Sequence, residues 1–224
     1  MYWILFIGTL VASQLVSWNF KRKFTKYLNT QLSSGLTGAQ VAERMLHDNG
    51  IFDVKIISTE GQLTDHYNPA DKTVNLSDEV YHQRSIASAA IAAHECGHAI
   101  QHATAYTWLT MRSKLVPVVS IASNYVQWVL LGGMLTLNVF PQLMLIGIVM
   151  FALTTLFSVV TLPVEYDASN RALAWLNTAG ITQGQEHKDA KSALNAAANT
   201  YLVAAISSLA TLLYYVMRYM GSRD

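Results

Sequence analysis

Four long apolar stretches divide the chain, and each is close to the length that a membrane-spanning helix needs. They cover residues 2–20, 116–137, 142–162 and 201–217. A helix that crosses the hydrocarbon core of a bilayer takes about 20 mostly apolar residues. Only residues 138–141 separate the second stretch from the third, which is room for no more than a tight turn. The pattern predicts a multi-pass membrane protein with a transmembrane hairpin at 116–162.

The residues between these stretches follow the pattern of a small α+β unit. A helix is predicted over 37–50, where apolar residues recur at helical spacing behind a capping box at 37–40. Three short alternating runs, typical of strands, follow at 54–57, 62–67 and 73–76. A turn at 68–71 joins the last two into a hairpin. A longer helix begins after Ser85 and extends to about residue 103, and because it is apolar nearly all round we expect it at the domain's centre.

The composition agrees with a membrane protein that has a modest part in water. Of its 224 residues, 52% are hydrophobic and 13% are charged, whereas soluble domains carry about 25% charged residues. The formal net charge is +1, so there is no basic footprint for nucleic acid. The single cysteine excludes a disulfide framework and a cysteine-based zinc finger.

Lysine and arginine residues collect on one side of the predicted spans. They are Lys21, Arg22, Lys23 and Lys26 after the first, Arg112 and Lys114 before the second, and Lys188 and Lys191 before the fourth. Arg218 and Arg223 at the C-terminus count the other way, but only two residues do so. The positive-inside rule then predicts a protein of the cell (inner) membrane with its N-terminus outside and residues 21–115 and 163–200 in the cytoplasm. The first stretch lacks a basic leader and a small-residue cleavage site, so we interpret it as an uncleaved anchor.

The predicted central helix carries the sequence His94-Glu95-Cys96-Gly97-His98. Two histidines four residues apart lie on one face of a helix, so both imidazoles can reach one zinc ion. Glu95 lies beside the first histidine, where its carboxylate can take a proton from water that the metal acidifies. The motif predicts one Zn²⁺ per chain, with His94 and His98 as ligands and Glu95 as the catalytic group. The alternative is a pair of hydrogen-bonded core histidines, and each left unpaired would cost about 1–3 kcal/mol.

A catalytic zinc needs a third protein ligand. His102 continues the row of histidines but lies about 12 Å from His94 along a straight helix, so we expect it either to support a ligand without binding the metal or to be structural. The transmembrane hairpin returns the chain to the side that it left, and Glu165 follows directly. Glu165 is therefore the predicted third ligand, presented by a helix that starts at Pro163. The alternative for Glu165 is a solvated helix N-terminus, where acidic residues are favoured.

Other polar residues are candidates for supporting roles. Asp167 either supports the site or pairs with Arg171 on the next helical turn. Peptide hydrolysis also needs a donor for the oxyanion beyond the metal. The candidates for this donor are His66, Arg171, His187 and Tyr201. The strand at 74–77 either pairs with an extended substrate or is an edge strand that a loop covers.

These segments resemble the YugP-like bacterial membrane zinc metallopeptidases. The resemblance is carried by residues 63–69, 74–77, 92–101, 163–169 and 196–201. It implies His94, His98 and Glu165 as zinc ligands and Glu95 as the catalytic carboxylate. More distantly, the order of motif, hairpin and ligand glutamate is similar to HtpX-type and CAAX-prenyl proteases. Those have an aspartate four residues after the glutamate, where this chain has Ser169.

We therefore expect a mainly α integral membrane protein with about four transmembrane helices and a small α+β zincin-like catalytic domain. Its parts are an anchor at 2–20, the catalytic part at 21–115, the hairpin at 116–162, a helical part with the third ligand at 163–200, and a last span at 201–220. The predicted function is a gluzincin-type endopeptidase that cleaves peptide or membrane-protein substrates at the cytoplasmic face. The alternative is a zinc-stabilised scaffold or adaptor that does not cleave, in which Glu95 would have no role. A transporter is disfavoured, because no charged residue lies within the spans before Arg218.

Overall fold

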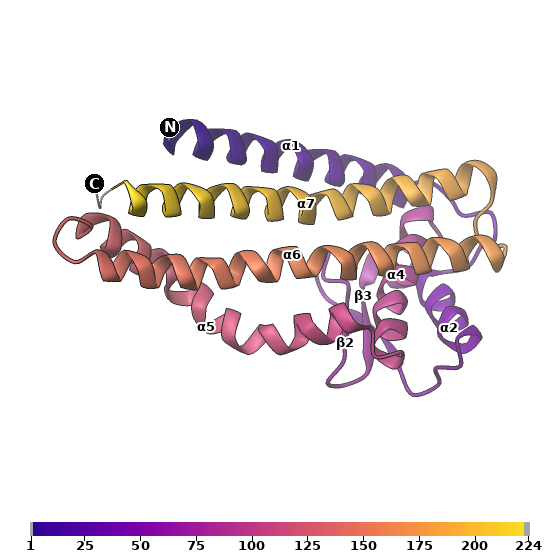
Figure 1. The fold of residues 1–224 in the computed structure, drawn as a ribbon. Helices are drawn as coiled ribbons and strands as arrows, with labels where there is room; N and C mark the ends of the chain where they lie inside the picture. The colour runs from indigo at the N-terminus through magenta and orange to yellow at the C-terminus, as the bar shows by residue number, and fades with distance from the viewer. Residues whose placement is uncertain (1, 222–224) are drawn as a thin grey trace. The chain divides into compact units, whose positions relative to one another are not determined.

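The computed structural model describes residues 2–221, which form a mainly helical chain with one small sheet (Figure 1). Its elements are α1 (Tyr2–Leu28), α2 (Gly38–Asp48), β1 (Lys55–Thr59), β2 (His66–Asn68), β3 (Thr73–Ser77), α3 (Asp78–His82), α4 (Ile86–Ala103), α5 (Thr107–Leu135), α6 (Pro141–Thr178) and α7 (Gly184–Met220). α1, α5, α6 and α7 are each long and apolar enough to cross a membrane. The predicted fold class, a mainly α membrane protein with a small α+β part, is confirmed.

The chain forms two compact units, which we name the helical unit and the α/β unit. The helical unit comprises Met1–Leu15, Thr110–Pro163 and Tyr201–Asp224, and the α/β unit comprises Val16–Leu109 and Val164–Thr200. α1, α5, α6 and α7 each contribute to both units.

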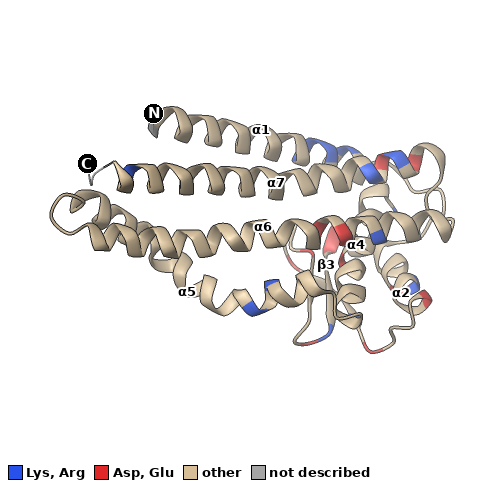
Figure 2. Ribbon diagram, in the orientation of Figure 1, with Lys and Arg blue, Asp and Glu red and all other residues tan. Residues whose placement is uncertain are grey.

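The long helices extend beyond the apolar stretches of the sequence. α1 continues through Lys21, Arg22, Lys23 and Lys26, which form the blue band near its C-terminal end in Figure 2. Lysine and arginine are good helix formers, so the change from apolar to basic sequence does not end the helix.

Pro163 lies inside α6, so the expected helix start at Pro163 is wrong. A proline removes one N–H donor from a helix, but the long helical segments on both sides continue through it. Glu165 consequently lies within a continuous helix and is only 3% exposed. The alternative in which Glu165 occupies a solvated helix N-terminus is therefore wrong as well.

The sheet of the α/β unit has the order β1-β3-β2. β2 and β3 form the predicted antiparallel hairpin, in which His66 faces Asn75 and Asn68 faces Thr73. The first strand of the hairpin is shorter than the expected 62–67 and covers His66–Asn68. β1 pairs with the other side of β3 in parallel, from Lys55 with Thr73 to Thr59 with Ser77. The central strand β3 is thus paired on both sides. Neither expectation for residues 74–77, a free strand for substrate or an edge under a loop, is right.

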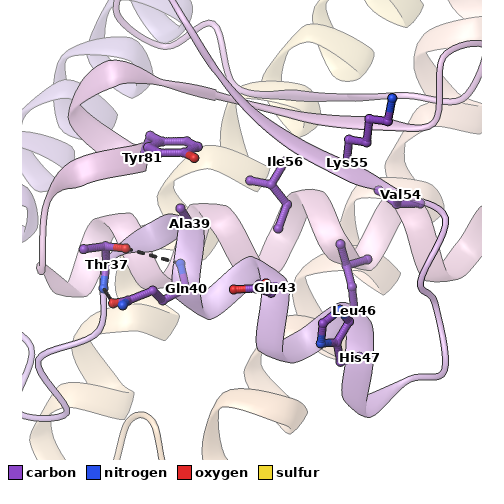
Figure 3. A pocket seen from close by; sticks show the side chains of 10 residues that line it. All are labelled: Thr37, Ala39, Gln40, Glu43, Leu46, His47, Val54, Lys55, Ile56 and Tyr81. Carbon is purple, nitrogen blue, oxygen red and sulfur yellow. Dashed lines mark hydrogen bonds between the residues drawn. The ribbon is translucent and has the colours of Figure 1, made fainter.

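α2 and α4 pack against each other and against the sheet. The predicted capping box is present, because the Thr37 side chain accepts from the Gln40 N–H and the Gln40 side chain accepts from the Thr37 N–H (Figure 3). Residues of α2 and β1, together with Tyr81 of α3, line a cavity of about 550 Å³; Figure 3 shows their side chains. α4 begins as predicted, with Ser85 accepting from the Ser88 N–H, and it packs against α2, α3 and the sheet. Its buried position explains its apolar, alanine-rich surface.

Candidate metal centre

α4 and α6 bring three potential metal ligands together inside the α/β unit. His94 Nε2 lies 3.3 Å from Glu165 Oε2, and His98 Nε2 lies 3.7 Å from the same oxygen. His98 is 8% exposed and Glu165 is 3% exposed, so two of the three side chains are buried. Zinc binds nitrogen and oxygen at about 2.0–2.2 Å, which sets tetrahedral ligands about 3.3–3.6 Å apart. The ligand atoms, all within 4.8 Å of one another, therefore have a spacing that fits one metal ion.

Gly97 lets the two helices approach this closely. A Cβ atom at Gly97 would lie 2.6 Å from the Ala168 carbonyl oxygen and 3.0 Å from its Cα. Both contacts are with backbone, which cannot turn away as a side chain can. Position 97, one residue before His98 on α4, therefore requires a residue without a side chain. Its partner in this contact is Ala168, three residues after Glu165 on α6.

The second ring nitrogen of each histidine has a partner of its own. His94 Nδ1 lies 3.0 Å from Ser169 Oγ, and His98 Nδ1 lies 3.0 Å from Gln101 Oε1. Histidines that ligate metals characteristically use the other ring nitrogen in this way, because the bond fixes the orientation of the ring. Ser169 thus contacts the first histidine from the position at which the more distant proteases have an aspartate.

Comparison with known proteins shows the family of this chain. Residues 2–220 match the model of a family described as "Putative neutral zinc metallopeptidase". The chain belongs to this family. It is 40% identical to the "Putative membrane protease YugP" of Bacillus subtilis (strain 168), over all of this chain and 99% of that protein. The expected YugP-like resemblance is confirmed, and no solved structure matches the chain. Together with the four apolar helices, this makes the chain a membrane protein of a zinc metallopeptidase family.

The donor set fits the metal that the family name gives. Two imidazoles and one carboxylate are a set that zinc takes in catalytic sites. Burial lowers the pKa of His98, but its hydrogen bond to the Glu165 carboxylate and the charges of Glu95 and Glu165 raise it by more, so its pKa lies above the usual value. A negative potential that favours a proton on a buried imidazole also favours a metal cation.

Glu95, the neighbour of His94 on α4, is buried. Its charge acts on a second carboxylate, that of Asp65. Burial raises the pKa of Asp65, and the charge of Glu95 raises it further, while two hydrogen bonds from Ser77 lower it. Sequence reasoning passed over Asp65, although residues 63–69 carry part of the family resemblance. It also passed over Gln101, whose position three residues after His98 on the same helical face was the available signal.

The remaining candidates have other neighbours. His66 Nδ1 contacts the Thr64 carbonyl oxygen, and His187 Nδ1 contacts Thr182 Oγ1. Tyr201 belongs to the helical unit, outside the unit that holds the three donors. These contacts do not single out an oxyanion donor.

Asp167 makes the ion pair with Arg171 that was one of the two expectations for it, and it also contacts Gln101. It accepts from Arg171 Nε at 2.6 Å and from Gln101 Nε2 at 2.8 Å. His102, expected either to support a ligand or to be structural, contacts the Tyr67 hydroxyl at 2.8 Å through its Nδ1.

Proposed function

We propose that this protein is a zinc-dependent membrane endopeptidase in which His94, His98 and Glu165 hold one zinc ion and Glu95 is the catalytic carboxylate. The observation that carries the proposal is the convergence of three donor atoms, from helices far apart in the sequence, at the spacing of metal ligands. Three protein ligands leave a position open for water and substrate, as in catalytic rather than structural zinc sites.

The chemistry divides between the metal and the chain. Bound zinc would act as a Lewis acid that lowers the pKa of water and polarises a peptide carbonyl. Glu95 is next to His94 on α4, and its carboxylate accepts a proton from the attacking water. The same carboxylate then donates that proton to the nitrogen of the leaving amine. His94 and His98 supply neutral nitrogens and Glu165 a negative oxygen, so the ligands offset only part of the charge of the metal.

We place the reaction at the cytoplasmic face of the cell membrane, with the N-terminus outside. Support comes from the basic residues 21–26, which directly follow the first apolar stretch, and from the positive-inside rule. The substrates are then peptides or membrane proteins that reach the site from that side.

The first test is the zinc content of the purified protein in detergent, measured by elemental analysis beside Glu165→Gln and Glu165→Ala. We expect about one zinc per chain in the wild type and much less in both variants. A folded wild-type protein without zinc overturns the metal site. Full zinc in both variants removes Glu165 from it.

The second test separates a protease from a zinc-stabilised scaffold. Glu95→Gln keeps the metal ligands but removes the proton acceptor, so cleavage of an unfolded protein such as casein should fall by about 10²–10⁴-fold with zinc retained. Glu60→Gln, an exposed glutamate of the same unit, is the matched control and should keep full activity. A Glu95→Gln protein that cleaves at the wild-type rate contradicts the mechanism.

A further inference from the structure

Gln101 is a fully buried polar side chain, 0% exposed, one turn after His98 on α4. Its Nε2 donates to the Val164 carbonyl oxygen at 2.8 Å and to Asp167 Oδ2 at 2.8 Å. Its Oε1 lies 3.0 Å from His98 Nδ1. One amide therefore joins α4 to α6 and contacts a proposed metal ligand at the same time.

These partners determine which way the amide points. A carbonyl oxygen and an ionised carboxylate accept hydrogen bonds and cannot donate them. The end of Gln101 that faces Val164 and Asp167 must consequently be the NH₂ group, and the end that faces His98 must be the oxygen. Because that oxygen only accepts, His98 Nδ1 must carry the hydrogen of the ring. In the neutral imidazole, the lone pair then lies on Nε2, the atom that faces Glu165.

Asp167 is itself held in place. Arg171 donates to its Oδ2 from one turn further along α6, and the Arg171 guanidinium lies over the Tyr106 ring at 5.8 Å. These contacts hold the carboxylate oriented toward Gln101. A charged acceptor also makes a stronger hydrogen bond than a neutral one, so it polarises the amide that contacts His98.

The Nδ1 contact of the other histidine, His94, sets no such constraint. Its Nδ1 contacts the Ser169 hydroxyl, and a hydroxyl can donate or accept by rotating its hydrogen. The contact is compatible with either tautomer of His94. The two histidines of the motif are therefore not equivalent in this structure.

We propose that Gln101, held by Asp167, is the positioning residue that fixes His98 in the tautomer and orientation required for metal binding. The inference rests on the proposed metal site and assigns to Asp167 an action on His98 through the Gln101 amide. It also predicts a difference between the two histidines. The ring orientation of His98 depends on Gln101 and, through it, on Asp167, whereas that of His94 does not.

The test compares zinc affinity, measured by competition with a chromophoric chelator, in Gln101→Leu, Gln101→Glu, Asp167→Asn and the double variant Q101E/D167N. Gln101→Leu keeps the size of the side chain and loses its polar contacts, so we expect zinc to bind about 10–100-fold more weakly. Gln101→Glu should bind as weakly, because it places a second carboxylate against Asp167. Cys96→Ala, a buried residue of α4 on the α2 side of the helix, is the matched control and should bind zinc as the wild type does.

The double variant distinguishes positioning from general packing. Asp167→Asn in the wild-type background should weaken zinc binding, but in the Gln101→Glu background it should strengthen it, since the introduced amide can donate to the introduced carboxylate. The visible absorption of the cobalt-substituted protein should change in Gln101→Leu and return toward the wild type in the double variant. A purely packing role for Gln101 would give additive losses with no such reversal, and that result overturns the proposal.

A metal-free measurement keeps this inference separable from the proposed function. In protein labelled with ¹⁵N-histidine, at a pH where the rings are neutral, we expect His98, assigned through His98→Asn, to carry its hydrogen on Nδ1. The Gln101→Leu variant should lose this preference. A wild type that shows the preference without binding zinc contradicts the metal site alone. A zinc-binding wild type in which Gln101→Leu changes neither affinity nor tautomer contradicts the role of Gln101 alone.

Discussion

The two units use their polar side chains differently. In the α/β unit, several buried polar groups bond to side chains of other segments, as Gln101 does to Asp167 and Ser77 to Asp65. In the helical unit, several hydroxyl groups bond to carbonyl oxygens of their own helix, three or four residues earlier. Examples are Thr136 to Gly132, Thr154 to Phe151, Ser158 to Thr154, Thr161 to Phe157, Ser208 to Ala205 and Thr211 to Ser207. The buried Thr155 Oγ1, by contrast, has no hydrogen-bond partner among the described residues.

The physical reason is the environment for which each unit is built. A hydroxyl group in lipid has no water to bond, and the nearest acceptor is the preceding turn of its own helix. Such a bond satisfies the group but specifies no neighbour. Contacts between helices are then left to small residues and van der Waals packing. In the α/β unit the polar bonds themselves specify which elements meet.

Both units nevertheless contain a close helix contact at a glycine, and this allows a direct comparison. A Cβ at Gly97 would lie 2.6 Å from the Ala168 carbonyl oxygen, and a Cβ at Gly133 would lie 2.6 Å from Met144 Cα. Gly97→Ala should separate α4 from α6, destabilise the protein by about 1–3 kcal/mol and weaken zinc binding by about 100-fold. Gly133→Ala should cost similar stability but leave zinc affinity unchanged, because the α5–α6 contact holds no ligand.

Zinc competition and thermal unfolding in one detergent measure both effects. Gly8→Ala is the control, since nothing lies within 4 Å of a Cβ at that position. Equal losses of zinc affinity in the Gly97 and Gly133 variants would show that the metal site depends on packing throughout the chain.

Two serine-to-alanine substitutions test the same difference between the units, with a smaller expected loss of stability. Ser77 is 1% exposed and donates to the Asp65 carboxylate at 3.1 Å, so Ser77→Ala should cost about 1.5–3 kcal/mol. Ser158 donates to the Thr154 carbonyl oxygen of its own helix, so Ser158→Ala should cost less than about 0.6 kcal/mol. Thermal shifts of equal size in the two variants would contradict the distinction between the units.

The smallest predicted effect concerns pH, and it is confined to the α/β unit because residues 2–15, 110–163 and 201–221 contain no Asp or Glu. Burial, and then the charge of Glu95, raise the pKa of Asp65 above 3.8. The fold therefore favours the protonated form, and the wild type loses stability as pH rises through that raised pKa. Asp65→Asn does not titrate, so its melting temperature relative to the wild type should increase from about pH 4 to pH 8. Glu95→Gln should reduce this dependence, and an unchanged difference across the range would argue against the Asp65 shift.

Local features of the sequence predicted much of the fold. The four apolar helices, the capping box at Thr37, the start of α4 at Ser85 and the β2–β3 hairpin were all predictable. The spacing of the two histidines in the motif likewise predicted two donors on one helical face. Each depends on residues within a turn or two of one another, where spacing alone determines which side chains meet.

Contacts between distant segments were decided only by the tertiary structure. The parallel pairing of β1 with β3, the passage of α6 through Pro163 and the Gln101–Asp167 bond across 66 residues have no local signature. Glu165 was predicted as a ligand from topology, but its 3.3 Å approach to His94 requires the glycine contact between α4 and α6. The sequence by itself thus determined the segments and the type of chemistry. Tertiary packing decided which buried polar groups became partners. A polar group can be buried without a large cost only where the fold places a hydrogen-bond donor or acceptor beside it.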